Sequence, residues 1–267
     1  MKPKRGRHLK TVFWNIKGKP ENIRSIIEYG KHNNIDVILL CECSILSGID
    51  TTPYVAVKHV VKASEFEVLV NTSTRFIYTR EKKRYCILQA IGSPTFNLVL
   101  IHLNSEHSPN AENIRASDIQ DIKEELVIEE EKNDKKSLIV GDFNINILDK
   151  QMIGVDGFNA KLFRYQVERG YQTIHGKRHE IFYNPMLKLY RDIANEKKPK
   201  GTYFYKNASP EWFCYDHILL RQSMLNYIDC NCLRIVDRLS DTLIKNHRAK
   251  ETYSDHLPLY FESKQEV

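Results

Sequence analysis

The sequence contains no long hydrophobic run, which argues against a membrane-spanning protein. The basic residues within segment 1–7 are followed by an apolar stretch that is too short for a membrane span or for the core of a signal peptide. We therefore expect a soluble, cytoplasmic protein that does not bind membranes. Repeats and low-complexity linkers are also missing, and the 11 glycines and 9 prolines are scattered singly. This pattern predicts a basic lead over residues 1–10 and a single domain over residues 11–262, and it favours no oligomeric state.

Cysteine is scarce, with six residues in a chain of 267. This number fits reduced thiols better than a disulfide framework. The two closest pairs, Cys41/Cys43 and Cys230/Cys232, have one residue between them, whereas zinc-binding pairs commonly have two to four. We therefore expect no zinc site.

Positive charge is in modest excess, because the formal net charge is +6 at pH 7. A surface of this kind attracts polyanions without being as basic as that of a histone. The strongest basic bias after the N-terminus lies in residues 175–200. Two interpretations of this segment stay open, namely a solvated loop and a loop that grips phosphates. In the second case the substrate-binding side chains are those of Arg178, Lys197, Lys198 and Lys200.

The hydrophobic pattern predicts alternating strands and helices. A strand at residues 12–14 is followed by a helix that begins near Pro20 and by a strand at residues 37–40, which together make a β-α-β unit. Short segments rich in β-branched and aromatic residues indicate antiparallel strands. These and the remaining elements are strands at 54–61, 65–70, 74–80, 85–91, 97–101, 138–140, 203–205, 218–220 and 257–261, helices at 111–132 and 158–169, and an irregular stretch at 175–200. The order predicts a four-layered α-β-β-α sandwich, with two mixed sheets and helices on both outer faces.

Polar side chains lie at the ends of several apolar strands. Asn15, Glu42, His102 and the segment from Asp142 to Asn144 each follow a strand, at its carboxyl end. Near the C-terminus the order reverses, because Asp216 precedes one strand, and Asp255 and His256 precede another. If the last two strands run antiparallel to the first four, all these side chains reach the same rim of the sandwich.

This convergence of Asp, Glu, Asn and His is typical of metal-assisted phosphoryl transfer. Mg²⁺ and Mn²⁺ prefer hard oxygen ligands, and the chemistry needs a proton-transfer group beside them. Several carboxylates buried together are costly unless a cation or hydrogen bonds compensate them. The pattern therefore predicts a site for Mg²⁺ or Mn²⁺ on the rim.

The same residues resemble the motifs of the endonuclease/exonuclease/phosphatase superfamily, which includes deoxyribonuclease I and exonuclease III. The resemblance covers most of the chain, from Thr11 to Phe261. Gly-Asp-Phe-Asn and Ser-Asp-His-x-Pro are specific when they occur together in this order. The matching segments are Trp14-Asn15, Glu42, Ile101-His102-Leu103, Gly141-Asp142-Phe143-Asn144, Tyr215-Asp216-His217-Ile218-Leu219 and Ser254-Asp255-His256-Leu257-Pro258.

The resemblance implies a metal site at Glu42, helped by Asn15 and by Asp255, either directly or through water. The match is not to every branch of the superfamily. Nucleases that repair abasic sites often have an acidic residue two positions after the motif asparagine and a lysine two positions after the glutamate. This chain has Lys17 and Ser44 at those positions, which argues against close kinship with that branch.

The resemblance also implies the catalytic roles. Asp142 and Asn144 would position the attacked phosphate and the water. His256 would contact the phosphate, as a general base or as a cation, and Asp216 would accept its other ring proton. His102 would be a second phosphate contact or the acid for the leaving oxygen.

We therefore expect a divalent-metal-dependent nuclease that cleaves nucleic acid, with DNA as the favoured partner, by attack of water, leaving 3'-OH and 5'-phosphate ends. A phosphatase or phosphodiesterase for a non-nucleic substrate is the alternative. It is suggested by residues 210–216, which partly match the Pro-x-Trp-Cys-Asp motif of inositol polyphosphate 5-phosphatases but with additional residues in between. A catalytically inactive nucleic-acid-binding module is the third hypothesis, and no main motif is visibly lost.

Overall fold

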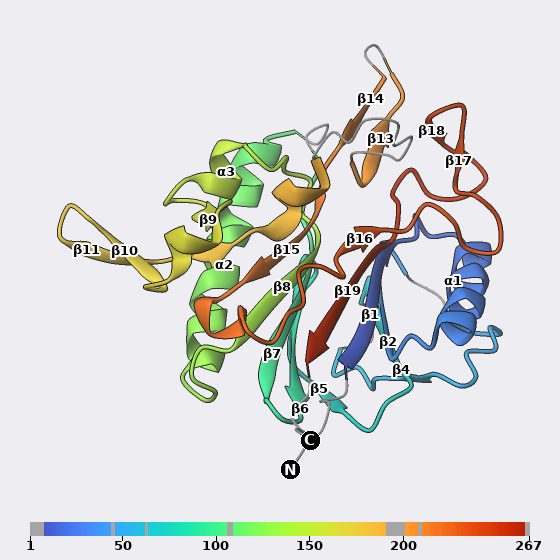
Figure 1. Ribbon diagram of the computed structural model, residues 1–267, viewed down its shortest axis with the longest axis horizontal. Helices are drawn as coiled ribbons and strands as arrows, with labels where there is room; N and C mark the ends of the chain where they lie inside the picture. The colour runs from blue at the N-terminus through green and yellow to red at the C-terminus, as the bar shows by residue number, and fades with distance from the viewer. Residues whose placement is uncertain are drawn as a thin grey trace.

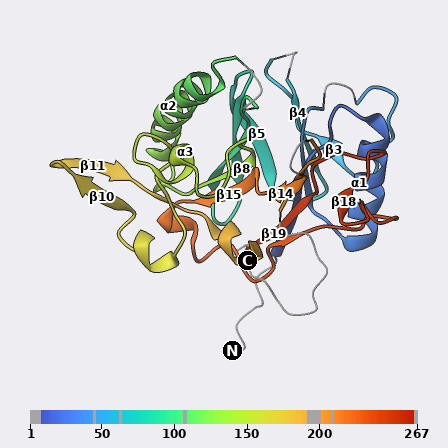
Figure 2. The same ribbon diagram turned by 90° about the horizontal axis from the view of Figure 1, so that it is seen from above.

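Two mixed β-sheets of six and seven strands pack face to face in the computed structural model of the chain (Figure 1). The structure describes residues 8–43, 46–61, 64–105, 109–190, 201–207 and 210–264. Helix α1 (Pro20–Asn33) covers the outer face of the first sheet and helix α2 (Ala111–Glu130) covers that of the second, as Figure 2 shows from above. The four-layered α-β-β-α sandwich predicted from the sequence is confirmed.

The first sheet has the order β16-β19-β1-β2-β4-β3. Its central strands β1 and β2 are parallel and are connected by α1, whereas β19 is antiparallel to β1. Helix α1 begins at Pro20 because proline fits the first turn, and it ends at Asn34, which adopts the left-handed conformation. The strands are β1 (His8–Asn15), β2 (Val37–Cys41), β3 (Val55–Ala56), β4 (Phe66–Val70), β16 (Arg234–Ile235) and β19 (Leu259–Lys264).

The second sheet has the order β5-β6-β7-β8-β15-β12-β9. Strands β7 and β8 are parallel and are joined by α2, and β15 lies antiparallel to β8. The strands are β5 (Arg75–Glu81), β6 (Tyr85–Ile91), β7 (Phe96–His102), β8 (Ser137–Asp142), β9 (Ala160–Lys161), β12 (Phe182–Tyr183) and β15 (Asp216–Leu220).

Three hydrophobic layers hold the sandwich together. The central layer lies between the sheets and receives alternate side chains of each strand, such as Phe13 and Leu39 from one sheet and Leu100 from the other. A second layer packs α1 on the first sheet, and a third packs α2 on the second sheet. Because the inner strands are covered on both faces, they are apolar along their whole length until they reach the rim.

The remaining elements are short. They are helix α3 (Lys150–Ile153), the 3₁₀ helices η1 (Arg164–Val167), η2 (Pro185–Tyr190) and η3 (Gln222–Met224), and three hairpins, β10 (Tyr171–Ile174) with β11 (Lys177–Glu180), β13 (Tyr203–Tyr205) with β14 (Glu211–Phe213), and β17 (Ile244–Lys245) with β18 (Arg248–Ala249). None of the described helices is both long enough and apolar enough to cross a membrane.

Three local predictions were wrong. Residues 158–169 form β9 and η1 instead of a helix, because this segment pairs with β12 and Asn159 turns the chain with a φ of 54°. The strand expected at 54–61 is limited to β3, since the Glu81 carboxylate accepts the backbone N–H groups of Val60 and Val61. Within 175–200, the described part includes β11, β12 and η2, whereas residues 191–200 lie outside the described residues.

Candidate active site

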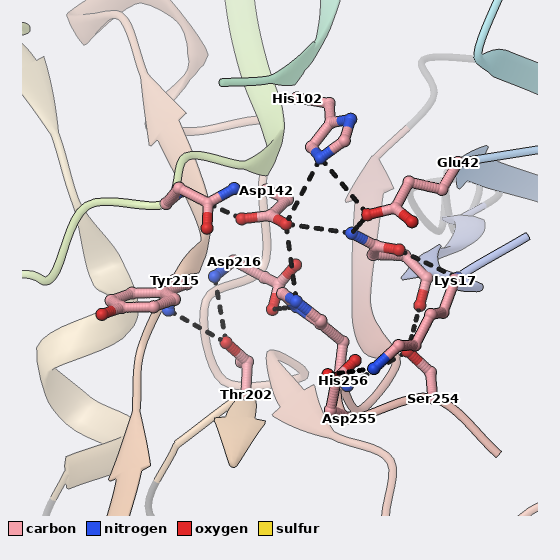
Figure 3. A network of polar contacts seen from close by, with 12 residues as sticks. Lys17, Glu42, His102, Asp142, Thr202, Tyr215, Asp216, Ser254, Asp255 and His256 are labelled. Carbon is pink, nitrogen blue, oxygen red and sulfur yellow. Dashed lines mark hydrogen bonds and ion pairs between the residues drawn. The ribbon is translucent and has the colours of Figure 1, made fainter. Parts of the chain in front are cut away.

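The polar ends of six strands meet at one rim of the sandwich. In the second sheet, Asp142 is the register partner of His102 on β7 and of Asp216 on β15. In the first sheet, Asn15 at the end of β1 is the partner of Cys41, which directly precedes Glu42. Figure 3 shows the resulting network of polar side chains. A pocket of about 610 Å³ opens above it, and its lining includes Glu42, His102, Asp142, Asn144, Asp255 and His256.

His256 lies between two buried carboxylates. Its Nδ1 atom is 2.8 Å from Oδ2 of Asp216, and its Nε2 atom is 3.5 Å from Oδ2 of Asp142. Burial lowers the pKa of His256, but the carboxylates of Asp216, Asp142 and Asp255 outweigh it and raise that pKa to about 10. The ring is therefore an imidazolium at neutral pH. Tyr203 packs against it, with 4.8 Å between ring centroids.

Asp142 is the centre of the network. Its Oδ1 accepts the backbone N–H of Asn144, and its Oδ2 accepts the side-chain amide of Asn15, both at 2.9 Å. The side chain is 1% exposed, and burial raises its pKa against the opposing effects of His256, His102 and Asn15. This carboxylate gains from any cation that reaches it, because its charge is only partly compensated by the protein.

Glu42, His102 and Asp142 form a group that can hold a metal ion, because their ligand atoms lie within 4.8 Å of one another. Nε2 of His102 is 3.4 Å from Glu42 and 3.9 Å from Asp142. The Glu42 side chain is 37% exposed toward the pocket, so an ion bound there keeps access to water. Two carboxylates that share one imidazole fit a hard divalent cation.

Asn15 contacts this group through its amide nitrogen. Nδ2 donates to Glu42 and to Asp142 at 2.9 Å each, while Oδ1 accepts the backbone N–H of Lys17. In this arrangement Asn15 holds the two carboxylates in place and does not turn its oxygen toward them. Metal binding by Asn15 stays a prediction, and these hydrogen bonds show that its nitrogen positions Glu42 and Asp142.

Asp255 is paired with Lys17. The distance from Nζ of Lys17 to Oδ2 of Asp255 is 2.5 Å. Burial raises the pKa of Asp255, but His256 and Lys17 more than offset that effect and lower it. Asp255 lines the pocket but is not one of the three ligand residues that lie within 4.8 Å of one another.

The segment around His256 is anchored on β1. Trp14 donates its indole N–H to the backbone oxygen of His256, and the Ser254 hydroxyl donates to the backbone oxygen of Asn15. On the other side, the Thr202 hydroxyl accepts the backbone N–H groups of Tyr215 and Asp216. These bonds fix the positions of Asp216 and His256 relative to each other.

Several pocket residues carried no motif in the sequence. The Glu65 carboxylate lies 3.3 Å from Nδ1 of His102, and Arg84 and Tyr203 also line the pocket. They come from loops and a hairpin whose positions depend on tertiary packing. No local sequence pattern identifies these residues, except that Glu65 directly precedes an apolar strand.

The structure describes one of the four predicted substrate-binding residues, Arg178. Lys197, Lys198 and Lys200 lie outside the described residues. Arg178 lies on the β10–β11 hairpin, where its Nε is 3.0 Å from Glu180 and its guanidinium is 3.9 Å from the Tyr171 ring centroid. That hairpin projects from the α2 side of the molecule, away from the hairpins near the pocket (Figures 1 and 2).

His217 has a structural environment. It is fully buried, with Nε2 2.9 Å from the Ile145 backbone oxygen and Nδ1 3.2 Å from the Asn184 amide. Burial lowers its pKa to about 4, so the ring is neutral.

Comparisons of the sequence with protein-family models and with curated proteins found no match. Solved structures, in contrast, include many with a similar fold. One is the endonuclease domain of TRAS1, a telomere-specific non-LTR retrotransposon. It is 13% identical, the alignment covers 97% of this chain and 98% of that chain, and the TM-score is 0.58.

Two further structures are similar over the same extent. D. rerio TDP2, complexed with a single-stranded DNA product, is 16% identical, with 97% and 99% of the two chains covered and a TM-score of 0.61. An AP endonuclease from Archaeoglobus fulgidus is 15% identical, with 97% and 100% covered and a TM-score of 0.55. At these identities the similarity establishes a shared fold.

Proposed function

Because the chain has the deoxyribonuclease I-like fold of the endonuclease/exonuclease/phosphatase superfamily, we propose that it is a divalent-metal-dependent nuclease. It hydrolyses phosphodiester bonds of nucleic acid by attack of water, with DNA as the expected substrate and 3'-OH and 5'-phosphate as the expected ends. The observation that carries this proposal is the pocket in which the Asp216–His256–Asp142 network meets Glu42 and His102. Fold alone does not decide function, so the argument rests on these side chains.

His256 acts as a cation in this proposal. With a pKa of about 10 it enters the reaction protonated, and Asp216 holds its Nδ1 at 2.8 Å. A fixed positive charge next to a phosphate stabilises the negative charge that develops on its oxygens in the transition state. Of the two roles that the sequence left open for this residue, general base and cation, the protonation state supports the second.

Asp142 positions the attacking water and accepts its proton. Two donors, Asn15 and the backbone of Asn144, hold both of its oxygens at 2.9 Å. As a carboxylate held beside the pocket, it can accept a proton from a water that lies next to the phosphate. His102 lies on the opposite side of the pocket floor from His256 and contacts a phosphate oxygen or the leaving oxygen.

Glu42 and Asp142 would hold the metal ion, because they supply the oxygen ligands that Mg²⁺ and Mn²⁺ prefer. When bound, the ion would polarise a phosphoryl oxygen and lower the pKa of a coordinated water. Asn15 keeps Glu42 and Asp142 at a fixed separation. DNA as substrate is supported by the D. rerio TDP2 structure, which contains a single-stranded DNA product.

The test is a cleavage assay on a panel of substrates. Plasmid, linear and single-stranded DNA, RNA and phosphoinositides are incubated with the protein in Mg²⁺ or Mn²⁺, and in EDTA. We expect cleavage of nucleic acid that EDTA abolishes. Full activity in EDTA would contradict the metal dependence, and turnover of a phosphoinositide alone would replace the nuclease by a phosphatase.

Two variants connect the activity to the pocket. His256→Ala and Asp142→Asn should each reduce kcat by about 10²–10⁴-fold, while the affinity for nucleic acid stays close to that of the wild type. His175→Ala is the matched control, since His175 is exposed in the β10–β11 turn. A His256→Ala variant with wild-type kcat would refute the assigned site.

A further inference from the structure

A large groove continues from the active-site pocket. Its volume is about 1260 Å³, and it shares Lys17 and Asp255 with the pocket, so the two hollows are connected. One wall is formed by the chain from Asp241 to Tyr253, which includes the β17–β18 hairpin, and Phe204 and Lys206 also line the groove. This hairpin lies beside β13–β14 near the same end of the sandwich (Figure 1).

The groove is lined by six basic and three acidic side chains. Each acidic side chain is paired with a lysine: Asp255 with Lys17 at 2.5 Å, Asp241 with Lys250 at 2.6 Å, and Glu251 with Lys206 at 3.4 Å. Lys19 is also occupied, because its ammonium group donates to two backbone carbonyls, those of Glu251 and Tyr253. The acidic charge of the lining is therefore balanced without Lys245 and Arg248.

Lys245 and Arg248 lie opposite each other on the β17–β18 hairpin. Both are exposed, and neither is within ion-pair distance of a carboxylate of the described residues. Like charges that face each other directly across two strands destabilise the pair. Repulsion between Lys245 and Arg248 therefore slightly destabilises the free protein, and a bound anion would remove this repulsion.

The backbone of this hairpin is held in place. Its two turn residues, Asn246 and His247, have φ values of 51° and 61°, as in the tight turns that match the twist of a two-stranded ribbon. The indole N–H of Trp212 on β14 donates to the His247 backbone oxygen at 2.9 Å, which ties the turn to the neighbouring hairpin. A preorganised backbone places the two side chains next to each other without further ordering of the chain when an anion binds.

We propose that this groove binds the sugar–phosphate backbone of a nucleic-acid strand that extends from the cleaved bond, with Lys245 and Arg248 gripping a phosphate away from the reaction centre. The inference rests on the proposed nuclease function and deepens it. A small phosphate ester or an inositol phosphate occupies only the pocket, whereas a polymer fills the pocket and the groove together. The groove therefore makes the enzyme selective for polynucleotides over small phosphodiesters.

The experiment compares two substrates in one double variant, Lys245→Gln with Arg248→Gln. The substrates are a labelled single-stranded DNA of about 20 nucleotides and bis(p-nitrophenyl) phosphate, a small ester that does not reach the hairpin. Loss of the grip on this phosphate should lower kcat/KM for the DNA by about 10-fold and reduce the slope of log affinity against log salt concentration by about 0.7. Hydrolysis of the small ester should be unchanged.

A matched control removes the same two charges elsewhere. Arg169→Gln with Lys177→Gln changes one exposed arginine and one exposed lysine near the β10–β11 hairpin, on the other side of the molecule. This control should cleave both substrates like the wild type. An equal loss in the control, or an equal loss on both substrates in the groove variant, would overturn the proposal, as would unchanged DNA cleavage in the groove variant.

The binding role of the groove and the proposed nuclease function can be refuted separately. If the wild type hydrolyses neither substrate, the nuclease function is refuted, and fluorescence anisotropy of the labelled DNA still tests the groove. Weaker binding by the groove variant than by the control variant supports the proposed surface. Equal binding by wild type, groove variant and control refutes it.

Discussion

His256 and His217 are both buried histidines near the rim, yet their environments give them opposite charge states. Asp216, Asp142 and Asp255 surround His256 and raise its pKa to about 10, although burial acts in the other direction. His217 contacts a backbone oxygen and an amide, and burial lowers its pKa to about 4. One ring thus carries a positive charge at neutral pH and the other is neutral. Each state has a measurable consequence.

The charge of His256 predicts the alkaline limb of the pH–rate profile. If the imidazolium is required, kcat/KM falls as pH rises through the pKa of His256. Asp216→Asn removes one of the carboxylates that raise this pKa, so the alkaline limb should move to lower pH by at least about one pH unit. The profile of kcat/KM against pH measures this. Asp134→Asn is the control, because Asp134 is exposed and pairs with Lys136 far from the pocket. An identical alkaline limb in wild type and Asp216→Asn would rule out the cationic role of His256.

The neutral state of His217 predicts a loss of stability in acid. Below pH 6.5 the unfolded chain binds a proton at this ring, while the folded chain does not until pH falls to about 4. The free energy of unfolding should therefore decrease as pH falls through this window, by on the order of 3 kcal/mol from this group. In His217→Gln the decrease between pH 6.5 and pH 4 should be smaller, whatever its stability at pH 7. Urea unfolding at several pH values tests the slope, and parallel curves for both proteins would contradict the assignment.

At the level of elements, β8 passes unusually close to β7 at Gly141. A Cβ atom at this position would lie 2.1 Å from the backbone oxygen of Ile101, which is the register partner of Gly141. The close approach of the two strands thus requires glycine directly before Asp142, which gives a structural reason for this residue of the Gly-Asp-Phe-Asn segment.

Gly141→Ala should accordingly be strongly destabilising. Relief of the clash needs a shift of β7 or β8, and we expect a loss of about 3 kcal/mol in the free energy of unfolding together with a lower kcat, because Asp142 moves with the strand. Gly176→Ala is the control: Gly176 has a φ of 74° in an open turn with no atom within 4 Å of the added Cβ, so its cost is limited to about 1 kcal/mol of backbone strain. Equal unfolding free energies for the two variants would show that β7 and β8 can move apart at little cost, which would contradict this prediction.

At the level of the whole molecule, metal binding and folding stability should be linked. The proposed oxygen ligands are Glu42, next to the first sheet, and Asp142 of the second sheet, so an ion bound there would connect both halves of the sandwich. Ligands that bind only the folded state stabilise it by about 2.7 kcal/mol at 100 times their Kd.

The melting temperature should consequently rise by about 5–10 °C in saturating Mn²⁺ and return to its starting value in EDTA. Glu42→Ala should lose most of this rise, since it removes the exposed oxygen ligand. Glu112→Ala, an exposed acidic residue in the first turn of α2, should retain it. Thermal scans with and without Mn²⁺ give the comparison, and a rise that persists in Glu42→Ala would locate the ion elsewhere.

The amino-acid sequence by itself determined the long strands of both sheets, the two main helices and the rim. A short apolar run with a polar end indicates a buried strand that reaches the rim. This is a local property, so it can be read from the sequence. For this reason Glu42, Asp142, Asp216 and His256 could be assigned to one site from their positions relative to apolar strands and from motif spacing. The sandwich followed from the same pattern.

Only the tertiary structure decided how these side chains contact one another. Asn15 faces the carboxylates with its nitrogen because its oxygen is held by the backbone of Lys17, and Lys17 in turn pairs with Asp255, which is 238 positions away. The high pKa of His256 and the exposure of the two cations on the β17–β18 hairpin likewise depend on which groups approach from distant segments. Coulombic interactions and burial are set by distances in space, and no local pattern of residues specifies those distances.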